Sequence, residues 1–355
     1  IDMVRILEEK EYAYRADDGS VYFSVSRFRG YGKLSGRRTE EMIAGARVDI
    51  EDLKRDPLDF ALWKRSKEGE PWWDSPWSKG RPGWHIECSA MSTHFLGATL
   101  DIHGGGRDLI FPHHENETAQ AEAALGAEFV RYWIHNGFVT IDGEKMSKSL
   151  GNFMTIRELT KDVHPEILRL LLLSRHYRSP IDFSNEAVNS ARQALVRFYE
   201  MLDRVNHSPA EDRESRLKGL VGTFSSDFDE AMCDDFNTAK AIACLHDLTT
   251  EINRALDQDP KISRKDQSAL KASMREVTDI FGVFGEEPGE FLEAMKRGSV
   301  QVTGLSEQEI QGLIEERNLA RKTKNFKRAD EIRDTLKAKG IQLKDSPEGT
   351  AWEKI

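Results

Sequence analysis

The chain has 355 residues, of which 39% are hydrophobic and 32% charged, and this composition excludes a disordered or a fibrous protein. The length leaves room for two or three domains, and no apolar run approaches the roughly twenty residues of a membrane span, so we expect a cytoplasmic protein without membrane contact. The formal net charge of -10 means that any nucleic-acid partner must bind to a locally basic surface.

The first part of the chain, to about residue 67, is predicted to be a small α/β module. The amphipathic pattern of residues 2–9 predicts a helix, residues 19–25 predict a strand, and residues 60–63 predict a second strand or a helix. Residues 70–84 hold four tryptophans among prolines and glycines, which is typical of an irregular loop. These tryptophans predict either a surface that docks a ligand or encloses an apolar pocket, or plain packing between two modules.

The next part, from residue 85 to residue 152, alternates apolar strand-like runs with helical segments and glycine turns, which is the α/β pattern. Apolar residues at heptad-like spacing then predict an all-helical region that continues to about residue 296. Ser306 and Glu309 form a capping box that predicts another helix, and residues 341–352 predict a short hairpin.

A basic run lies near the C-terminus of this otherwise acidic chain. Residues 316–339 contain nine Lys or Arg against four Asp or Glu, a local net charge of +5. Such a run is often a solvated helix face, but here it is also consistent with contact to a phosphate backbone.

A short polar run with two lysines, Lys145-Met146-Ser147-Lys148-Ser149, follows the strand-like residues 138–141 and the turn pair Asp142-Gly143. Lysines three residues apart can direct both ammonium groups at one polyanion, and triphosphate is the obvious candidate. An isolated match of this length is more often a solvated loop. The preceding strand and the following Gly151-Asn152 favour the phosphate hypothesis.

A candidate metal site is formed by Cys88, His113 and Glu117. Because Pro112 suits a first helical position, His113 and Glu117 are predicted to share one face of a helix. A thiolate, an imidazole and a carboxylate together suit zinc, and three protein ligands leave a position for a substrate. The alternative is a helix with His and Glu on its surface. His114 is predicted to point elsewhere and to pack or to support a ligand.

A glycine-rich run, Asp101-Ile102-His103-Gly104-Gly105-Gly106-Arg107-Asp108, is predicted to be a strand that ends in three glycines. Such an end lets a ligand approach the backbone, and Asp108 would accept hydrogen bonds from ribose hydroxyls. A tight turn without ligand is the alternative. The chain has neither Gly-x-Gly-x-x-Gly nor the Walker phosphate loop, so a dinucleotide enzyme or a Walker-type ATPase is unsupported.

Taken together, these runs resemble the cysteinyl-tRNA synthetases, a family of class I aminoacyl-tRNA synthetases. The two-lysine run matches the second class I signature. The runs at residues 82–91, 101–106 and 111–117 closely resemble this one family, and the resemblance extends through Gly349-Thr350-Ala351-Trp352.

The resemblance implies an activity, its substrates and a set of site residues. The family condenses L-cysteine with ATP, accompanied by Mg2+, to cysteinyl adenylate and then transfers cysteine to the 3' end of tRNA(Cys). One zinc ion per chain binds the substrate thiolate, and Trp84 falls where the family packs an indole against the cysteine side chain. Lys145 and Lys148 are the implied catalytic residues. The implied zinc ligands are Cys88, His113 and Glu117, and the implied ATP-binding residues are Gly104, Gly105, Gly106, Asp108, Lys145, Ser147, Lys148 and Ser149.

The resemblance also implies an α/β plus all-α fold and a monomer. The fold comprises the second half of a Rossmann-type catalytic domain, a helical anticodon-binding bundle and a small C-terminal α/β module. The expected domains are a connective insertion (1–75), the catalytic half with the zinc site and the two-lysine loop (76–152), a stem-contact region (153–190), the helical bundle (191–300) and a tRNA-binding module (301–355).

One part of the family pattern is absent from the chain. The first class I signature, His-x-Gly-His, and the cysteine before it do not occur, and His103-Gly104 is no substitute because it belongs to the glycine-rich run. We therefore expect that the chain begins inside the connective insertion and does not form the adenylate by itself. Two alternatives stay open: a paralogous ligase that joins cysteine to an amino sugar, and a non-catalytic tRNA-binding fragment. A structural zinc protein would leave the two-lysine loop unexplained.

Overall fold

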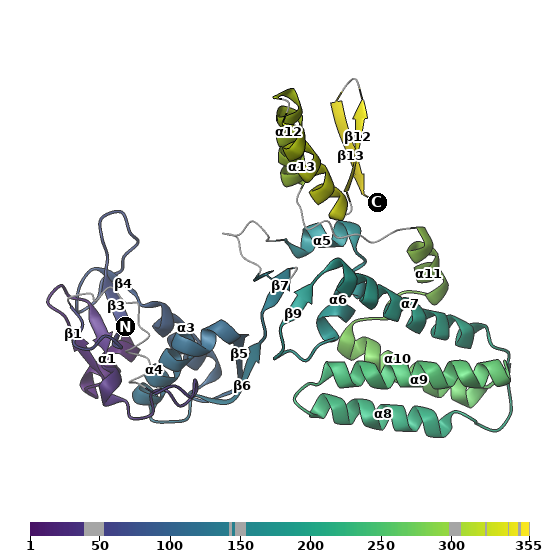
Figure 1. The fold of residues 1–355 in the computed structure, drawn as a ribbon. Coiled ribbons are helices and arrows are strands. Elements are labelled where there is room, and N and C mark those ends of the chain that lie inside the picture. The colour runs from purple at the N-terminus through teal and green to yellow at the C-terminus, as the bar shows by residue number, and fades with distance from the viewer. Residues whose placement is uncertain are drawn as a thin grey trace. The chain divides into compact units, whose positions relative to one another are not determined.

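The computed structural model describes residues 1–38, 53–141, 144–145, 154–297, 307–323, 325–339, 341–346 and 349–354. The chain divides into two compact units, residues 1–136 and residues 137–355 (Figure 1). Among the helices within these ranges, none combines the length and the apolar character that crossing a bilayer requires.

The first unit opens with a helix and an antiparallel sheet: α1 (Asp2–Glu9), β1 (Ala13–Arg15), β2 (Val21–Phe23), β3 (Phe60–Arg65) and β4 (Gly80–Pro82), with the strands in this order. Helix α1 buries Val4 and Leu7 in the same core as β2 and β3, so the predicted helix and first strand are confirmed. Residues 60–63, predicted to be a strand or a helix, belong to strand β3. All of its first four residues are buried, as expected for a strand covered on both faces.

The tryptophan-rich loop is irregular except for β4, which pairs with β3, a single antiparallel bridge between Trp73 and Gly80, and Trp84, with which the next helix begins. Trp77 packs: its indole N–H donates a 2.6 Å hydrogen bond to the Glu8 carboxylate on α1. Trp72 and Trp73 are exposed. Packing between segments therefore accounts for at least one of these tryptophans.

The rest of the first unit is a parallel strand pair with two helices: α3 (Trp84–Leu96), β5 (Leu100–Gly106), α4 (Glu115–Leu125) and β6 (Val130–Asn136). Strands β5 and β6 are parallel and α4 connects them, which confirms the α/β prediction. The tight-turn alternative for the glycine-rich run is wrong, since Gly104, Gly105 and Gly106 pair with β6 inside the strand.

Helix α4 begins at Glu115, three residues later than predicted. Phe111 has extended angles (φ -138, ψ 130) inside a π-helical turn, Ile110–His114, which comes before the regular helix. The residue before a proline is sterically disfavoured from helical angles, so Pro112 delays this helix instead of opening it.

The second unit combines a small sheet with a helical bundle: β7 (Val139–Ile141), β8 (Glu144–Lys145), α5 (Ile156–Asp162), α6 (Pro165–Leu173), β9 (Ile181–Phe183), α7 (Asn185–His207), β10 (Ala210–Glu211), α8 (Lys218–Cys233), α9 (Thr238–Gln258), β11 (Ile262–Ser263), α10 (Arg264–Phe281) and α11 (Pro288–Arg297). Strand β7 lies between β8 and β9, and α8 and α9 lie side by side (Figure 1). Large apolar side chains such as Leu195, Phe198 and Phe228 form a continuous core. The region is helical as predicted, except that the short strands β9, β10 and β11 interrupt it.

The C-terminal segment has its own core and comprises α12 (Glu307–Lys322), α13 (Phe326–Ala338), β12 (Ile341–Ser346) and β13 (Gly349–Lys354). Strands β12 and β13 pair antiparallel, which confirms the predicted hairpin. The basic run falls on α12 and α13. Ser306 of the predicted capping box lies outside the described residues. The five domain boundaries stay predictions.

Glu166 ties α6 to α7 and to the chain that follows α10. Its buried carboxylate accepts hydrogen bonds from the Tyr199 hydroxyl (2.9 Å) and from the backbone N–H groups of Phe284 (3.0 Å) and Gly285 (2.8 Å). The Tyr199 hydroxyl in turn accepts a 3.3 Å bond from the N–H of Glu286. One carboxylate on α6 therefore satisfies donors from two other parts of the bundle, α7 and the chain that follows α10.

Glu166→Ala is expected to lower the free energy of unfolding by about 3 kcal/mol, because it leaves a hydroxyl and two backbone N–H groups without their acceptor. Urea denaturation followed by circular dichroism measures this loss. Glu200→Ala removes an exposed glutamate of α7 and is the control, with an expected change below about 0.5 kcal/mol. Equal losses in the two variants would show that water replaces the Glu166 carboxylate.

Candidate functional site

Helix α3, the π-helical turn Ile110–His114 and helix α4 bring the three predicted metal ligands into one group. The ligand atoms of Cys88, His113 and Glu117 all lie within 4.8 Å of one another. Cys88 comes from the second turn of α3, His113 from the π-helical turn and Glu117 from the first turn of α4. His113 and Glu117 are a pair at i, i+4 spacing, and Cys88 lies 25 or more positions before them in the sequence.

The Glu117 carboxylate is completely buried. Nε2 of His113 lies 2.5 Å from one of its oxygens, and Nε2 of His103 lies 3.2 Å from the other. Within the described ranges, neither oxygen accepts a hydrogen bond of acceptable geometry. Burial raises the pKa of Glu117 to about 7. A divalent cation among these atoms would offset the cost of burying the carboxylate, so the residues fit a metal ion.

The protonation of the neighbouring groups also suits a metal. Burial lowers the pKa of His113, and it lowers the pKa of His85 to about 4, so both imidazoles are neutral at pH 7 and keep a lone pair for bonding. Burial, assisted by the Glu117 charge, raises the pKa of the Cys88 thiol to about 11. This thiol would therefore ionise at neutral pH only beside a cation.

Further histidines extend from the group, and three of them, His85, His103 and His135, were not predicted from the sequence to belong to it. Nδ1 of His85 lies 2.8 Å from Nδ1 of His113, and Nδ1 of His114 lies 2.8 Å from Nε2 of His135. His103 and His114 also form a second close group with Glu117. The available signal was their density, because six of the ten histidines fall between residues 85 and 135.

Trp84 lies at the edge of this group. It stands one helical turn before Cys88 on α3, so the two side chains share a helix face. The indole is 62% exposed, and its ring centroid lies 4.5 Å from that of His113. An exposed aromatic surface therefore borders the three candidate ligands.

The glycine-rich run packs against the histidines. A Cβ atom on Gly105 would stand 2.7 Å from Cε1 of His114, so the absence of a side chain there makes room for the imidazole. Asp108 lies in the short 3-10 turn Arg107–Leu109 that follows β5. A nucleotide-binding role for Gly104, Gly105, Gly106 and Asp108 stays a prediction.

Most of the two-lysine loop lies outside the described residues. The backbone of Lys145 belongs to β8, which pairs antiparallel with β7. Ser147, Lys148 and Ser149 lie outside the described residues, as does the side chain of Lys145.

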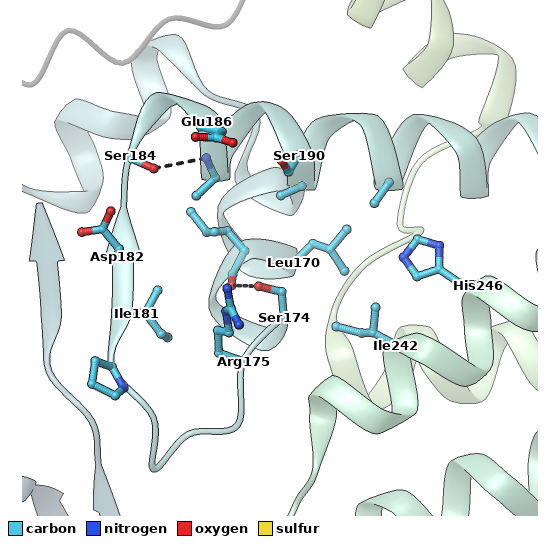
Figure 2. A pocket seen from close by; sticks show the side chains of 15 residues that line it. Leu170, Ser174, Arg175, Ile181, Asp182, Ser184, Glu186, Ser190, Ile242 and His246 are labelled. Atoms are coloured by element: carbon cyan, nitrogen blue, oxygen red, sulfur yellow. Dashed lines mark hydrogen bonds between the residues drawn. The ribbon is translucent and has the colours of Figure 1, made fainter. Parts of the chain in front are cut away.

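A separate cavity of about 510 Å³ lies in the second unit, between α6, β9, α7 and α9 (Figure 2). Its charged lining residues are Arg175, Asp182 and Glu186, and its apolar wall includes Ile181 and Ile242. Cationic and anionic side chains are mixed around it, so its charge selects neither an anion nor a cation. It contains none of the predicted site residues.

Comparison with known proteins first defines the class. Residues 1–193 match the family model described as tRNA synthetases class I (C) catalytic domain, and residues 227–285 match the DALR domain. A crystal structure of Mycobacterium tuberculosis methionyl-tRNA synthetase bound by methionyl-adenylate shares the fold, with a TM-score of 0.53 and 15% identity over 77% of this chain and 68% of that chain. The fold is that of a class I aminoacyl-tRNA synthetase with a helical DALR domain, as predicted.

Closer relatives define the family. The cysteine--tRNA ligase of Geobacter sulfurreducens is 52% identical over 99% of this chain and 75% of its own length. That of Trichlorobacter lovleyi is 50% identical over 99% of this chain and 74% of its own length. The chain therefore belongs to the cysteine--tRNA ligases, a family of class I enzymes that attach an amino acid to tRNA, and the predicted family is confirmed.

Proposed function

We propose that the protein attaches L-cysteine to tRNA(Cys) through a cysteinyl adenylate, with one zinc ion per chain selecting the substrate thiol. The observation that carries this proposal is the convergence of Cys88, His113 and Glu117 around a buried carboxylate, next to the exposed Trp84 indole. These residues offer a metal position and an apolar surface at one place, as a small thiol substrate requires.

Selection of cysteine over serine follows from the chemistry of this group. Zinc held by Cys88, His113 and Glu117 would supply an open coordination position that prefers a thiolate to a hydroxyl. His85, which lies 2.8 Å from His113, would fix the orientation of that imidazole. The Trp84 indole would pack against the substrate β-carbon. Serine would then be rejected at binding, without a second editing site.

Activation of the amino acid is proposed to involve the two-lysine loop. The substrate carboxylate attacks the α-phosphorus of Mg2+-bound ATP, and pyrophosphate leaves. Lys145 and Lys148, with Ser147 and Ser149, would bind the triphosphate and stabilise the charge that develops on it. The glycines of β5 and Asp108 would contact the adenosine. The 3'-terminal hydroxyl of the tRNA then attacks the adenylate carbonyl and releases AMP.

The second unit is proposed to bind the tRNA. The helical bundle α7–α11 would contact the anticodon arm, and the segment α12–α13 carries the basic run, which suits phosphate contacts. The five predicted domains are part of this proposal. So are a monomeric state and a cytoplasmic location, where tRNA, ATP and cysteine occur together.

Two assays on the full-length protein test the proposal. Cysteine, but not serine, is expected to support ATP–pyrophosphate exchange, and radiolabelled cysteine is expected to become attached to tRNA(Cys). The helical region of the second unit favours tRNA over the amino-sugar acceptor of the paralogous ligase. Exchange with cysteine but transfer only to an amino sugar would support the paralogue. Binding of tRNA without exchange would support a non-catalytic module.

A further inference from the structure

A second carboxylate on α4, that of Glu115, is enclosed by a loop from the beginning of the chain. Glu115 is completely buried. One of its oxygens accepts a 2.9 Å hydrogen bond from the N–H of Gly32 and a longer one, 3.5 Å, from the N–H of Leu34. The other accepts a 2.7 Å bond from the N–H of Ser35. Three backbone N–H groups of one loop thus surround the charge, a known way to hold an anion.

The backbone of this loop, residues 31–36, is shaped for the carboxylate. Gly32 has a φ of +96°, in the left-handed region that side chains other than glycine rarely adopt. Its neighbour Tyr31 contacts the same helix, since its hydroxyl donates a 2.5 Å hydrogen bond to the side-chain oxygen of Asn116. The loop and the first turn of α4 therefore form one hydrogen-bonded unit.

The first turn of α4 is buried, and it begins at an irregular junction in the chain. No side chain caps its N-terminus, and the π-helical turn before it contains the extended Phe111, so the regular helical hydrogen bonds begin late. Glu115 and Glu117 are two positions apart and point to opposite sides of the helix. One carboxylate faces the loop, and the other faces Cys88 and His113.

We propose that Glu115 is a positioning residue for the metal site. By binding the loop of residues 31–36, it holds the first turn of α4 in place and so sets the separation of Glu117, His113 and Cys88. This inference rests on the proposed function, because it assumes that these three residues bind zinc. It adds that zinc binding requires Glu115 and the loop of residues 31–36, neither of which is among the proposed metal ligands.

The test measures metal binding, apart from activity, in the full-length protein. Glu115→Gln keeps the side-chain volume but replaces one acceptor oxygen with an amide NH2 that faces backbone donors. We expect the Kd for Zn2+ to rise about tenfold, as for other residues that orient ligands, and the Co2+-substituted protein to show shifted d–d absorption bands. KM for cysteine should rise more than kcat falls.

Two further variants make the result decisive. Gly32→Ala leaves Glu115 intact but strains the loop, and it is expected to reproduce the Zn2+ and Co2+ changes; it also decides the matter if Glu115→Gln does not fold. Glu128→Gln changes an exposed glutamate beyond the end of α4 and should match the wild type.

Two contrary results have different meanings. If both test variants melt at a lower temperature but bind Zn2+ and absorb with Co2+ as the wild type does, Glu115 is merely structural and the inference is wrong. If the wild-type protein binds no Zn2+ at Cys88, His113 and Glu117, the proposed function loses its metal site, and this inference falls with it.

Discussion

Replacing Cys88 with alanine is expected to abolish zinc binding and to lower kcat/KM for cysteine at least about 100-fold, which corresponds to about 3 kcal/mol of transition-state stabilisation. The thiolate is the softest of the three candidate ligands, and the remaining imidazole and carboxylate form an incomplete site for zinc. Metal analysis of the full-length protein gives the zinc content, and its cysteine-dependent ATP–pyrophosphate exchange gives kcat/KM.

Cys233→Ala is the matched control, because this cysteine is exposed at the end of α8 in the other unit. It should leave the zinc content and the exchange rate unchanged. His113→Ala should behave like Cys88→Ala, since both remove one ligand from the same group. Full zinc content in both Cys88→Ala and His113→Ala would place the metal elsewhere and refute the ligand assignment.

Replacing Lys148 with alanine is expected to lower kcat of ATP–pyrophosphate exchange by about 100- to 1,000-fold, with a much smaller effect on KM for cysteine. An ammonium group directed at the triphosphate stabilises the charge that builds up as pyrophosphate leaves, so we expect this contact to be stronger in the transition state than in the ground state. Steady-state exchange kinetics at saturating and limiting ATP separate kcat from KM.

Lys161→Ala removes an exposed lysine in the last turn of α5 and serves as the control for a general loss of positive charge. It should leave exchange unchanged. A Lys148→Ala variant with a higher KM for ATP and an unchanged kcat would indicate ordinary ground-state binding, and the catalytic role proposed for this lysine would then be wrong.

Local patterns account for much of the fold that the sequence predicted. Helix α1, strand β2 and the C-terminal hairpin follow from spacing that repeats within a few residues, and so does the helical region after residue 165. The predicted helix start at Pro112 was wrong. Proline disfavours helical angles in the residue before it, and Phe111 is extended, so the regular helix begins only at Glu115. Local patterns also left open whether the segment that begins at Phe60 is a strand, because a short apolar run suits either a strand or a helix.

The candidate site also has features that the sequence shows and features that only the tertiary structure shows. The i, i+4 spacing of His113 and Glu117, the thiol at Cys88 and the two-lysine run are visible in the sequence, and together they determined the family and the chemistry to test. The short distances from His85 to His113 and from His114 to His135 join separate elements, so no local pattern contains them. Likewise, only the packed structure shows that Glu115 is buried inside the loop of residues 31–36. A glutamate in a helix is normally solvated, and its environment depends on what the rest of the chain places around it.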